Sequence, residues 1–323
     1  MDIVSIDLGK KNSYVVVEKD GSVIKEGYTV TTKEGFGKFF SIVDRPTVIA
    51  ESSCTLDRAA TIIEESSPES NIVIAHPMKV KIISESVNKT DRNDAHTLLD
   101  MYKAKYLPES YLPEKKVRDE RNLCRNRNFL VRQRTAIKNR IHDQAYRLGI
   151  DLKSFTKKTL VDLSNASLPL MVLIEQLKST NMQIKVLNAE IDAECNANAN
   201  ASFIDSIPGI GPYSALGIAS EIGDIERFRS VENLWSYAGL IPKTHQSGSK
   251  EWKGHIIKGN VFLKYLLIEV VQIHILKCPY SPVTFAYQRV KARTGSKKAR
   301  IAAARHLLRV IYCLLKDQRN YRP

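Results

Sequence analysis

The most restrictive feature of this sequence is that signals for β-strands stop near residue 112. Before that point, short β-branched apolar runs such as residues 3–6 (IVSI) and 14–17 (YVVV) alternate with turns. After it, polar and basic sequence with helical spacing continues to about residue 200. The chain therefore predicts an α/β domain over residues 1–112, basic helices over 113–198 and a mainly helical last domain over 199–323.

The order of the strands before residue 112 favours one fold. The first two runs predict a hairpin, and residues 20–32 alternate apolar and polar side chains after an Asp-Gly turn, as a third strand would. Residues 47–52 and 71–76 are apolar runs on either side of a segment with helical spacing at 56–65. Three antiparallel strands followed by a strand, helix, strand unit is the order of an RNase H-like fold.

The helices expected after residue 112 are unusually basic, and they raise the charge of the whole chain. Lys and Arg total 49 against 35 Asp and Glu, which gives a formal net charge of +14. A partner with many negative charges is expected, and nucleic acid is the first candidate. The side chains that we expect to contact phosphate are Arg121, Arg125, Arg132, Lys138, Lys250 and Lys258.

Two long helices are expected in this region, over residues 113–148 and 169–196. Their apolar residues recur at steps of three and four, which fits an antiparallel hairpin or an oligomeric coiled coil. The pattern alone does not separate these two arrangements. Residues 196–202 (NANANAS) are small and polar and predict a linker to the last domain.

The hydropathy of the sequence predicts neither a membrane-spanning helix nor a signal peptide. The longest apolar stretch, residues 261–276, is interrupted by charged and polar side chains, and the N-terminus has no continuous apolar core like that of a signal peptide. A cytoplasmic protein with no membrane partner is expected.

Four carboxylates occupy positions that favour metal chemistry. Asp7 and Glu51 each follow a buried strand, and Asp91 and Asp94 lie three residues apart, on one face of an expected helix. Hard oxygen ligands suit Mg²⁺, and metal ions at such sites stabilise the attacking and leaving oxygens of a phosphodiester. The alternative is structural, because Asp91 could cap that helix with Asp94 as its capping-box partner.

Two segments of the last domain stand out. Residues 207–218 (IPGIGPYSALGI) resemble a helix-hairpin-helix element, whose backbone N–H groups can face a phosphate, although an ordinary turn between packed helices fits as well. Residues 237–260 predict a flexible loop rich in Gly, Ser and Lys that exposes the hydroxyl groups of Ser247 and Ser249. A serine nucleophile needs that access.

Five motifs in this order resemble those of the DEDD insertion-sequence transposases, a family related to the Piv invertases and described as bridge-RNA-guided recombinases. The motifs cover essentially the whole chain: SIDLGKKNSYVVV, AESS, KTDRNDAHTLL, IPGIGPYSALGIASEIGDIERF and YAGLIPKTHQSGSKEWKGHIIKGNVFLKYLL. The resemblance implies a RuvC-like first domain, a coiled-coil middle region and the family's C-terminal transposase domain.

The resemblance also implies roles for individual residues. The acidic tetrad that binds Mg²⁺ falls on Asp7, Glu51, Asp91 and Asp94, and the serine that joins covalently to DNA falls on Ser247, with Ser249 as a second hydroxyl nearby. The implied partners are donor and target DNA, a structured bridge RNA and further copies of the chain, from a dimer to a tetramer.

Two other functions fit the same residues. A RuvC-type junction resolvase or nuclease would use the acids with water as the nucleophile and would leave no protein on its product. A catalytically silent RNA- or DNA-binding protein would use only the basic helix, with the acids as helix caps.

Overall fold

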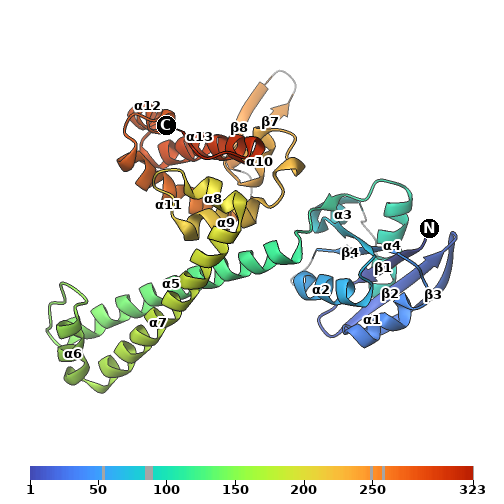
Figure 1. Ribbon diagram of the computed structural model, residues 1–323, viewed down its shortest axis with the longest axis horizontal. Helices are drawn as coiled ribbons and strands as arrows, with labels where there is room; N and C mark the ends of the chain where they lie inside the picture. Colours follow the sequence, from blue (N-terminus) through green and yellow to red (C-terminus); the bar gives the residue numbers. More distant parts are fainter. Residues whose placement is uncertain (53–54, 84–89, 248–249, 257–258, 323) are drawn as a thin grey trace. The chain divides into compact units, whose positions relative to one another are not determined.

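A computed structural model describes residues 1–52, 55–83, 90–247, 250–256 and 259–322, and the chain divides into two compact units, Met1–Lys115 and Lys116–Pro323 (Figure 1). The predicted boundary near residue 112 lies next to this division. The predicted middle and C-terminal regions both lie in the second unit. Within the described ranges, the helices are all too short or too polar to cross a membrane.

The first unit is an α/β structure built on a six-stranded sheet with the strand order β3-β2-β1-β4-β5-β6. Its elements are β1 (Ile3–Asp7), β2 (Asn12–Lys19), β3 (Ser22–Val30), α1 (Lys33–Phe40), β4 (Thr47–Glu51), α2 (Leu56–Ser66), β5 (Asn71–Ala75), α3 (Pro77–Ile83), α4 (Asp91–Lys103) and β6 (Glu109–Ser110). β1, β2 and β3 are antiparallel neighbours, whereas β4 is parallel to both β1 and β5. The predicted succession of three antiparallel strands and then a parallel strand, helix, strand unit is confirmed.

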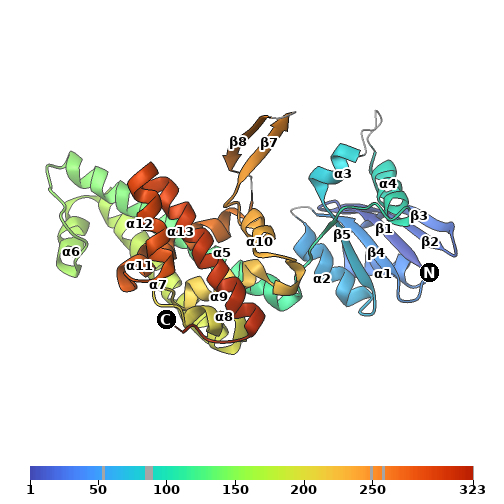
Figure 2. The ribbon, with the colours of Figure 1, turned by 90° about the horizontal axis from the view of Figure 1, so that it is seen from above.

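The sheet has an apolar core on each face, because its strands alternate the direction of successive side chains. One face carries Val4, Ile6 and Val48, which pack against Phe36 of α1 and Ile63 of α2. Helix α4 covers the opposite face, as Figure 2 shows. The residues of this second core are Ile3, Tyr14, Val16, Ile49, Ala75, Val80, Ala95, Leu98, Leu99 and Met101.

The second unit is almost entirely helical. Its elements are α5 (Lys115–Arg147), α6 (Lys157–Ala166), α7 (Leu168–Ala197), α8 (Ala199–Asp205), α9 (Pro212–Ile222), the 3-10 helix η1 (Ile225–Arg227), α10 (Val231–Tyr237), β7 (Pro242–Ser247), β8 (Lys250–Ile256), α11 (Val261–Lys277), α12 (Pro282–Thr294) and α13 (Ser296–Asp317). A large core joins α7, α9, α11 and α13.

The two long helices form an antiparallel hairpin within one chain. Arg127, early in α5, donates from Nε to Oδ1 of Asn188, late in α7, at 3.0 Å. At the other end, Ile141 of α5 shares a buried cluster with Leu170 and Ile174 of α7. Helix α6 lies at the turn between them (Figure 1). Of the two arrangements that the apolar pattern allowed, the structure has the antiparallel hairpin.

The prediction of a linker over residues 196–202 is wrong. Helix α7 ends at Ala197, and the side chain of Asn198 caps α8 by accepting from the backbone N–H of Ala201 at 3.1 Å. Ala201 and Ile204 are buried. Alanine is a strong helix former and asparagine a strong N-cap, so a composition that resembles a linker instead makes a corner between two helices.

Helices α8 and α9 are joined by a tight turn, which fits both a helix-hairpin-helix element and an ordinary turn between packed helices. Gly209 in this turn has φ +99°, and a Cβ on it would lie 2.8 Å from the backbone nitrogen of His274 in α11. Gly211, the N-cap of α9, has an ordinary backbone conformation, and a Cβ on it would have nothing within 4 Å. Gly209 is therefore required by its backbone conformation and by the close approach of α11, whereas Gly211 serves as an N-cap residue with space for a side chain.

We predict that Gly209→Ala lowers the free energy of unfolding by about 3 kcal/mol, because it adds left-handed strain and overpacks α11. Gly211→Ala is the matched control and should cost less than about 1 kcal/mol, the loss of a good N-cap residue. Urea titrations followed by circular dichroism measure both. Equal losses in the two variants would contradict this account of the turn.

Candidate active site

Asp7 and Glu51 lie at the same edge of the sheet. Each is the last residue of its strand, and β1 and β4 pair in parallel with Ile6 opposite Ala50. Alternation places Asp7 on the same face as Ile3, and Glu51 on the same face as Ile49. Both carboxylates therefore belong to the face that α4 covers, and both are partly buried.

Helix α4 runs antiparallel to β1, so its N-terminus lies at this edge. Ser5 Oγ donates to the carbonyl oxygen of Ala95 at 2.7 Å. At the far end of the helix, Lys103 Nζ donates to Glu18 Oε2 at 2.6 Å, beside the start of β1. Asp91 and Asp94 are both in the first turn of α4. The fold thus brings the elements that carry the four predicted acids to one edge of one face.

The structural alternative, in which Asp91 caps this helix, does not hold. Thr90 is the N-cap, and its Oγ1 accepts from the backbone N–H of Asn93 at 3.2 Å. Asp91 is instead the first helical residue and is exposed. Acidic side chains in the first turn are favoured by the positive end of the helix dipole. Asp91 therefore does not serve the capping role that was the structural alternative.

Two tyrosines extend the row of acids across the sheet. Tyr14 is opposite Asp7 on β2, and Tyr28 is opposite Tyr14 on β3. Their rings meet edge to face, with centroids 4.9 Å apart. The pKa of Tyr28 is raised by desolvation, then by the negative charge of Asp91 and a hydrogen bond to it, with a smaller effect of Asp7. Tyr28 thus links the acid on the helix to the edge of the sheet.

A second cluster, which the sequence analysis missed, lies beside this row. Glu26 of β3 pairs with Arg92 and with His96 of α4, and His96 Nε2 lies 2.6 Å from Glu26 Oε2. The pKa of Glu26 is lowered, first by the hydrogen bond from His96 and then by the charge of Arg92. The sequence held one indication of this cluster. Glu26 and Tyr28 are two residues apart in a predicted strand, so their side chains were expected on the same face of the sheet.

The donor chemistry of the four acids fits a hard divalent cation, since all of them offer carboxylate oxygens. Among the described residues, however, no three Asp, Glu, His or Cys side chains are grouped closely enough to hold one ion. The structure brings together the strand ends and the helix turn, and it does not assemble a finished ligand shell.

The predicted loop over residues 237–260 is largely a β-hairpin. β7 and β8 pair antiparallel, and Ser247 is opposite Lys250 at the end of the ladder. The backbone of these two residues is described but their side chains are not, and Ser249 and Lys258 lie outside the described residues. The sequence did not indicate these strands, because most residues here are polar and the alternation of apolar and polar residues typical of a half-buried strand is missing.

The hairpin is held at its base. Asn260, which follows β8 and caps α11, donates its backbone N–H to the carbonyl oxygen of Tyr237 at 2.7 Å. Its side-chain Nδ2 donates to Glu221 Oε2 at 2.6 Å and to the Tyr237 hydroxyl at 3.1 Å. A Cβ on Gly259 would lie 2.3 Å from the nitrogen of Gly239. The chain therefore enters and leaves the hairpin through one close backbone contact.

Two of the arginines expected to contact nucleic acid have partners inside the protein. Arg125 makes a bidentate bond to the fully buried carboxylate of Glu221, at 2.8 and 3.0 Å. Arg121 donates to the carbonyl oxygens of Ser220 and Glu221. Both guanidinium groups thus hold α5 to α9, and their contact with nucleic acid stays a prediction.

Arg132 and Lys138, the other two residues of α5 that are predicted to contact nucleic acid, lie against aromatic rings. The guanidinium of Arg132 is 5.9 Å from the ring centroid of Tyr265, and Lys138 Nζ is 4.9 Å from that of Phe155. These cation–π contacts leave the charged groups at the surface. Their binding to nucleic acid also stays a prediction.

Two family models match this chain. Residues 201–286 match a model described as the transposase IS116/IS110/IS902 family, and residues 4–147 match a second transposase model, named for DEDD transposases of the IS110 type.

Curated relatives agree with these models. The chain is 30% identical over 268 residues to the transposase for insertion sequence element IS1111A of Coxiella burnetii, which covers 76% of this chain and 71% of the relative. It is 27% identical over 254 residues to a probable family 20 transposase of Pseudomonas aeruginosa, with 73% and 75% covered. It is 29% identical over 257 residues to the pilin gene-inverting protein of Moraxella bovis, with 77% and 74% covered.

Glu221 offers a test of the contacts beneath the hairpin. We predict that Glu221→Gln lowers the free energy of unfolding by about 2 kcal/mol, because a neutral amide loses the charge-assisted bonds that the buried carboxylate accepts from Arg125 and Asn260. Glu226→Gln, which breaks a surface pair with Lys316, should cost less than about 1 kcal/mol. Urea titrations of both variants measure the difference, and a larger loss for Glu226→Gln would overturn the assignment.

Proposed function

This chain belongs to the IS116/IS110/IS902 family of transposases, and we propose that it cuts and rejoins the DNA of an insertion sequence through a phosphoserine intermediate. In this proposal Ser247 is the nucleophile, and Asp7, Glu51, Asp91 and Asp94 hold Mg²⁺. The observation that carries it is the convergence of two strand ends and the first turn of α4 on one edge of the sheet. A DEDD-type domain in a transposase implies DNA cutting with a divalent metal.

The acids have a defined part in the proposal. Asp7 and Glu51 of the sheet and Asp91 and Asp94 of helix α4 would hold the metal. Bound there, Mg²⁺ supplies positive charge that stabilises the oxygens of the scissile phosphate. Tyr28 positions the carboxylate of Asp91 through its hydrogen bond, and the charge of Arg92 beside it favours an anionic substrate.

The serine step conserves the phosphodiester. The Ser247 hydroxyl loses its proton as its oxygen forms a bond to phosphorus, and the bond from phosphorus to the leaving sugar oxygen breaks as that oxygen gains a proton. The DNA strand is then joined to Ser247. A sugar hydroxyl of another strand reverses the step and frees the serine, so rejoining needs no external source of energy.

The remaining parts of the proposal concern partners. A structured bridge RNA, donor DNA and target DNA are the nucleic acids, and the excess of Lys and Arg supports their binding. The working assembly is a homo-oligomer, from a dimer to a tetramer, in which the acids of one copy meet the serine of another.

We predict that Ser247→Ala abolishes a covalent protein–DNA adduct. The protein is incubated with Mg²⁺, the RNA of its element and labelled donor and target DNA, and a denaturing gel resolves a protease-sensitive shifted band. Ser249→Ala is the matched control and should keep the band. A band that persists in Ser247→Ala would refute this nucleophile, and nicked DNA without a band in the wild type would favour hydrolysis by water.

We also predict that Mg²⁺ stabilises the protein through the acids. At a concentration about 100 times Kd, the metal adds about 2.7 kcal/mol to the free energy of unfolding, which raises Tm. Asp7→Asn should remove this increase and, without metal, should be at least as stable as the wild type because repulsion among carboxylates falls. Asp57→Asn, on the helix of the opposite face, is the control and should respond to Mg²⁺ as the wild type does. Equal metal responses in all three proteins would contradict the site.

A further inference from the structure

Two adjoining cavities lie along α13, in a part of the second unit that the proposed chemistry does not use. The larger has a volume of about 420 Å³ and the smaller about 220 Å³. His306 and Arg309 line both of them. The larger is also lined by residues that follow α13, including Tyr321 and Arg322. We call the two together the α13 groove.

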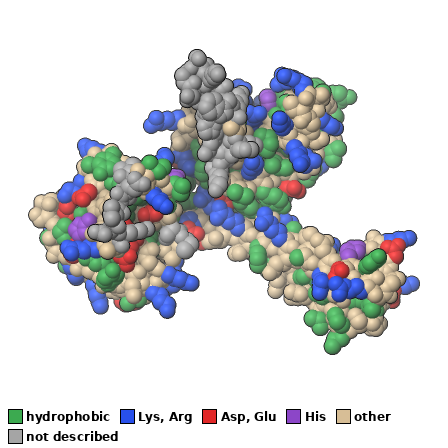
Figure 3. Space-filling model, turned by 180° about the vertical axis from the view of Figure 1, so that it is seen from behind, with side chains coloured by type: hydrophobic (Ala, Val, Ile, Leu, Met, Phe, Trp, Pro, Cys, Tyr) green, Lys and Arg blue, Asp and Glu red, His purple; other side chains and the backbone are tan. Residues whose placement is uncertain are grey.

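The α13 groove is cationic. Arg289 of α12 and Arg305 of α13 line the smaller cavity, and Arg319 and Arg322 line the larger one. No acidic side chain is among the described residues that line either cavity, although Arg319 also donates to Asp317 at 3.0 Å. Figure 3 shows, on the face seen from behind, Lys and Arg side chains at many points of the surface of the helical unit.

The pKa of His306 is affected by the same arginines. Its pKa is lowered, first by desolvation and then by Arg289, Arg305 and Arg309, which lie close enough to repel a proton from the imidazole. Three guanidinium groups near one imidazole, with no carboxylate in the described lining, are a suitable arrangement for a phosphate, although Arg309 also interacts with the charge of Glu232 outside the lining.

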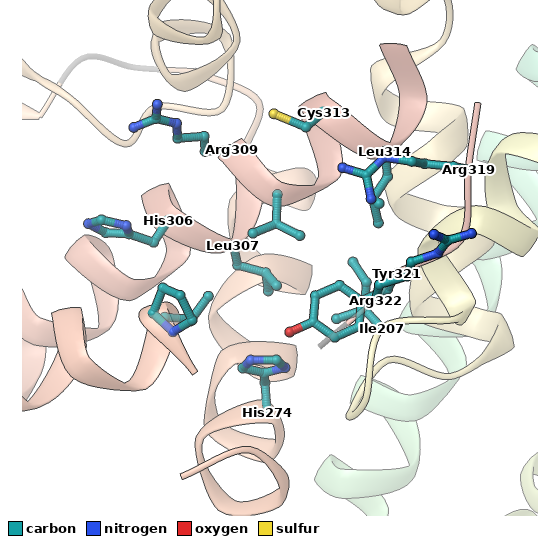
Figure 4. Close-up of a pocket in the computed structure, with 13 residues that line it drawn as sticks. Ile207, His274, His306, Leu307, Arg309, Cys313, Leu314, Arg319, Tyr321 and Arg322 are labelled. Atoms are coloured by element: carbon teal, nitrogen blue, oxygen red, sulfur yellow. The ribbon is translucent and has the colours of Figure 1, made fainter. Parts of the chain in front are cut away.

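The larger cavity has apolar walls between its charged ends. Leu307, Val310 and Leu314 of α13 line it, together with Ile207 from the turn before α9. Figure 4 shows His306 and Arg309 at one end and Arg319 and Arg322 at the other, with Leu307 between them. Tyr321 adds an aromatic ring to the wall. Positive ends with an apolar middle match one nucleotide of a strand, whose base lies between two flanking phosphates.

We propose that the α13 groove binds a single-stranded segment of nucleic acid and accepts one unstacked base in its larger cavity. The phosphate on one side of that nucleotide is bound by Arg309, Arg289 and Arg305, and the phosphate on the other side by Arg319 and Arg322. The base packs on the apolar wall and on the ring of Tyr321. A duplex is a poorer ligand, because its bases must leave the stack before they enter.

This inference takes from the proposed function only that nucleic acid is the substrate, and a binding measurement separates the two. The full chain is titrated, in buffer without divalent metal, into labelled strands of equal length: a thymidine strand, the same backbone with abasic sites, the matching duplex and a uridine RNA strand. Fluorescence anisotropy gives each Kd. The measurement contains no divalent metal and detects no cutting, so a failure of the proposed chemistry leaves this result unaffected.

The wild type should bind the thymidine strand about tenfold more tightly than the abasic strand. Tyr321→Ala should remove this preference. Tyr321→Phe, which keeps the ring that packs against the core of the second unit, should retain it. Arg309→Gln should weaken both strands about tenfold and lower the slope of log Kd against log salt by about one. Arg293→Gln, an exposed arginine one turn beyond Arg289 that lines neither cavity, is the matched control and should change neither quantity.

Several outcomes would overturn the proposal. They are equal binding of the thymidine and abasic strands by the wild type, a duplex that binds as tightly as the thymidine strand, or an Arg293→Gln variant weakened as much as Arg309→Gln. The RNA arm decides between the two sources of a single strand: tighter binding of the uridine strand assigns the groove to RNA, and tighter binding of the thymidine strand assigns it to DNA.

Discussion

The parallel pairing of β1 with β4 is the constraint on which the candidate active site depends. Parallel neighbours end at the same edge of a sheet, so a carboxylate that ends each strand is brought beside the other without any contact specific to the acids. The register then places Tyr14 and Tyr28 in the same row. Helix α4 completes the arrangement because its first turn lies over that edge, held by the bond from Ser5 to Ala95.

The same unit keeps its acids close to basic groups. Glu26 binds Arg92 and His96 directly beside the row, and the lowered pKa of Glu26 follows from that bond to His96. Carboxylates that are near one another raise each other's pKa, whereas a guanidinium nearby lowers it. The edge of the sheet therefore combines a cluster of anions with a cation that can face a phosphate.

In the second unit, positive charge has two separate uses. On α5, Arg121 and Arg125 hold the buried Glu221, and the same carboxylate accepts from Asn260 at the base of the β7–β8 hairpin. A buried carboxylate needs such partners, since it has lost its water. Around α13, by contrast, the arginines lie at the surface beside cavities with no acidic lining among the described residues. Net charge alone does not distinguish these two uses.

Much of the first unit follows from local pattern. The strands, their order and the positions of Asp7 and Glu51 were predictable because β-branched runs and alternation are local signals. Helices α1 and α3 and strand β6 were missed. Helix α1 contains two glycines, which are poor helix formers, and α3 and β6 have only seven and two residues.

Other features depended on contacts between distant residues. Residues far apart in sequence decide three of these features. They are the pairing of α5 with α7 within one chain, the contact of Arg125 with Glu221 and the hydrogen bond of Tyr28 to Asp91. The hairpin over residues 242–256 was hidden because its sequence has no regular alternation of apolar and polar residues. The sequence by itself determined which residue types each segment carries and the period of its apolar positions. Only the tertiary structure decided which of those residues meet, because burial and pairing belong to the packed chain and not to the segment.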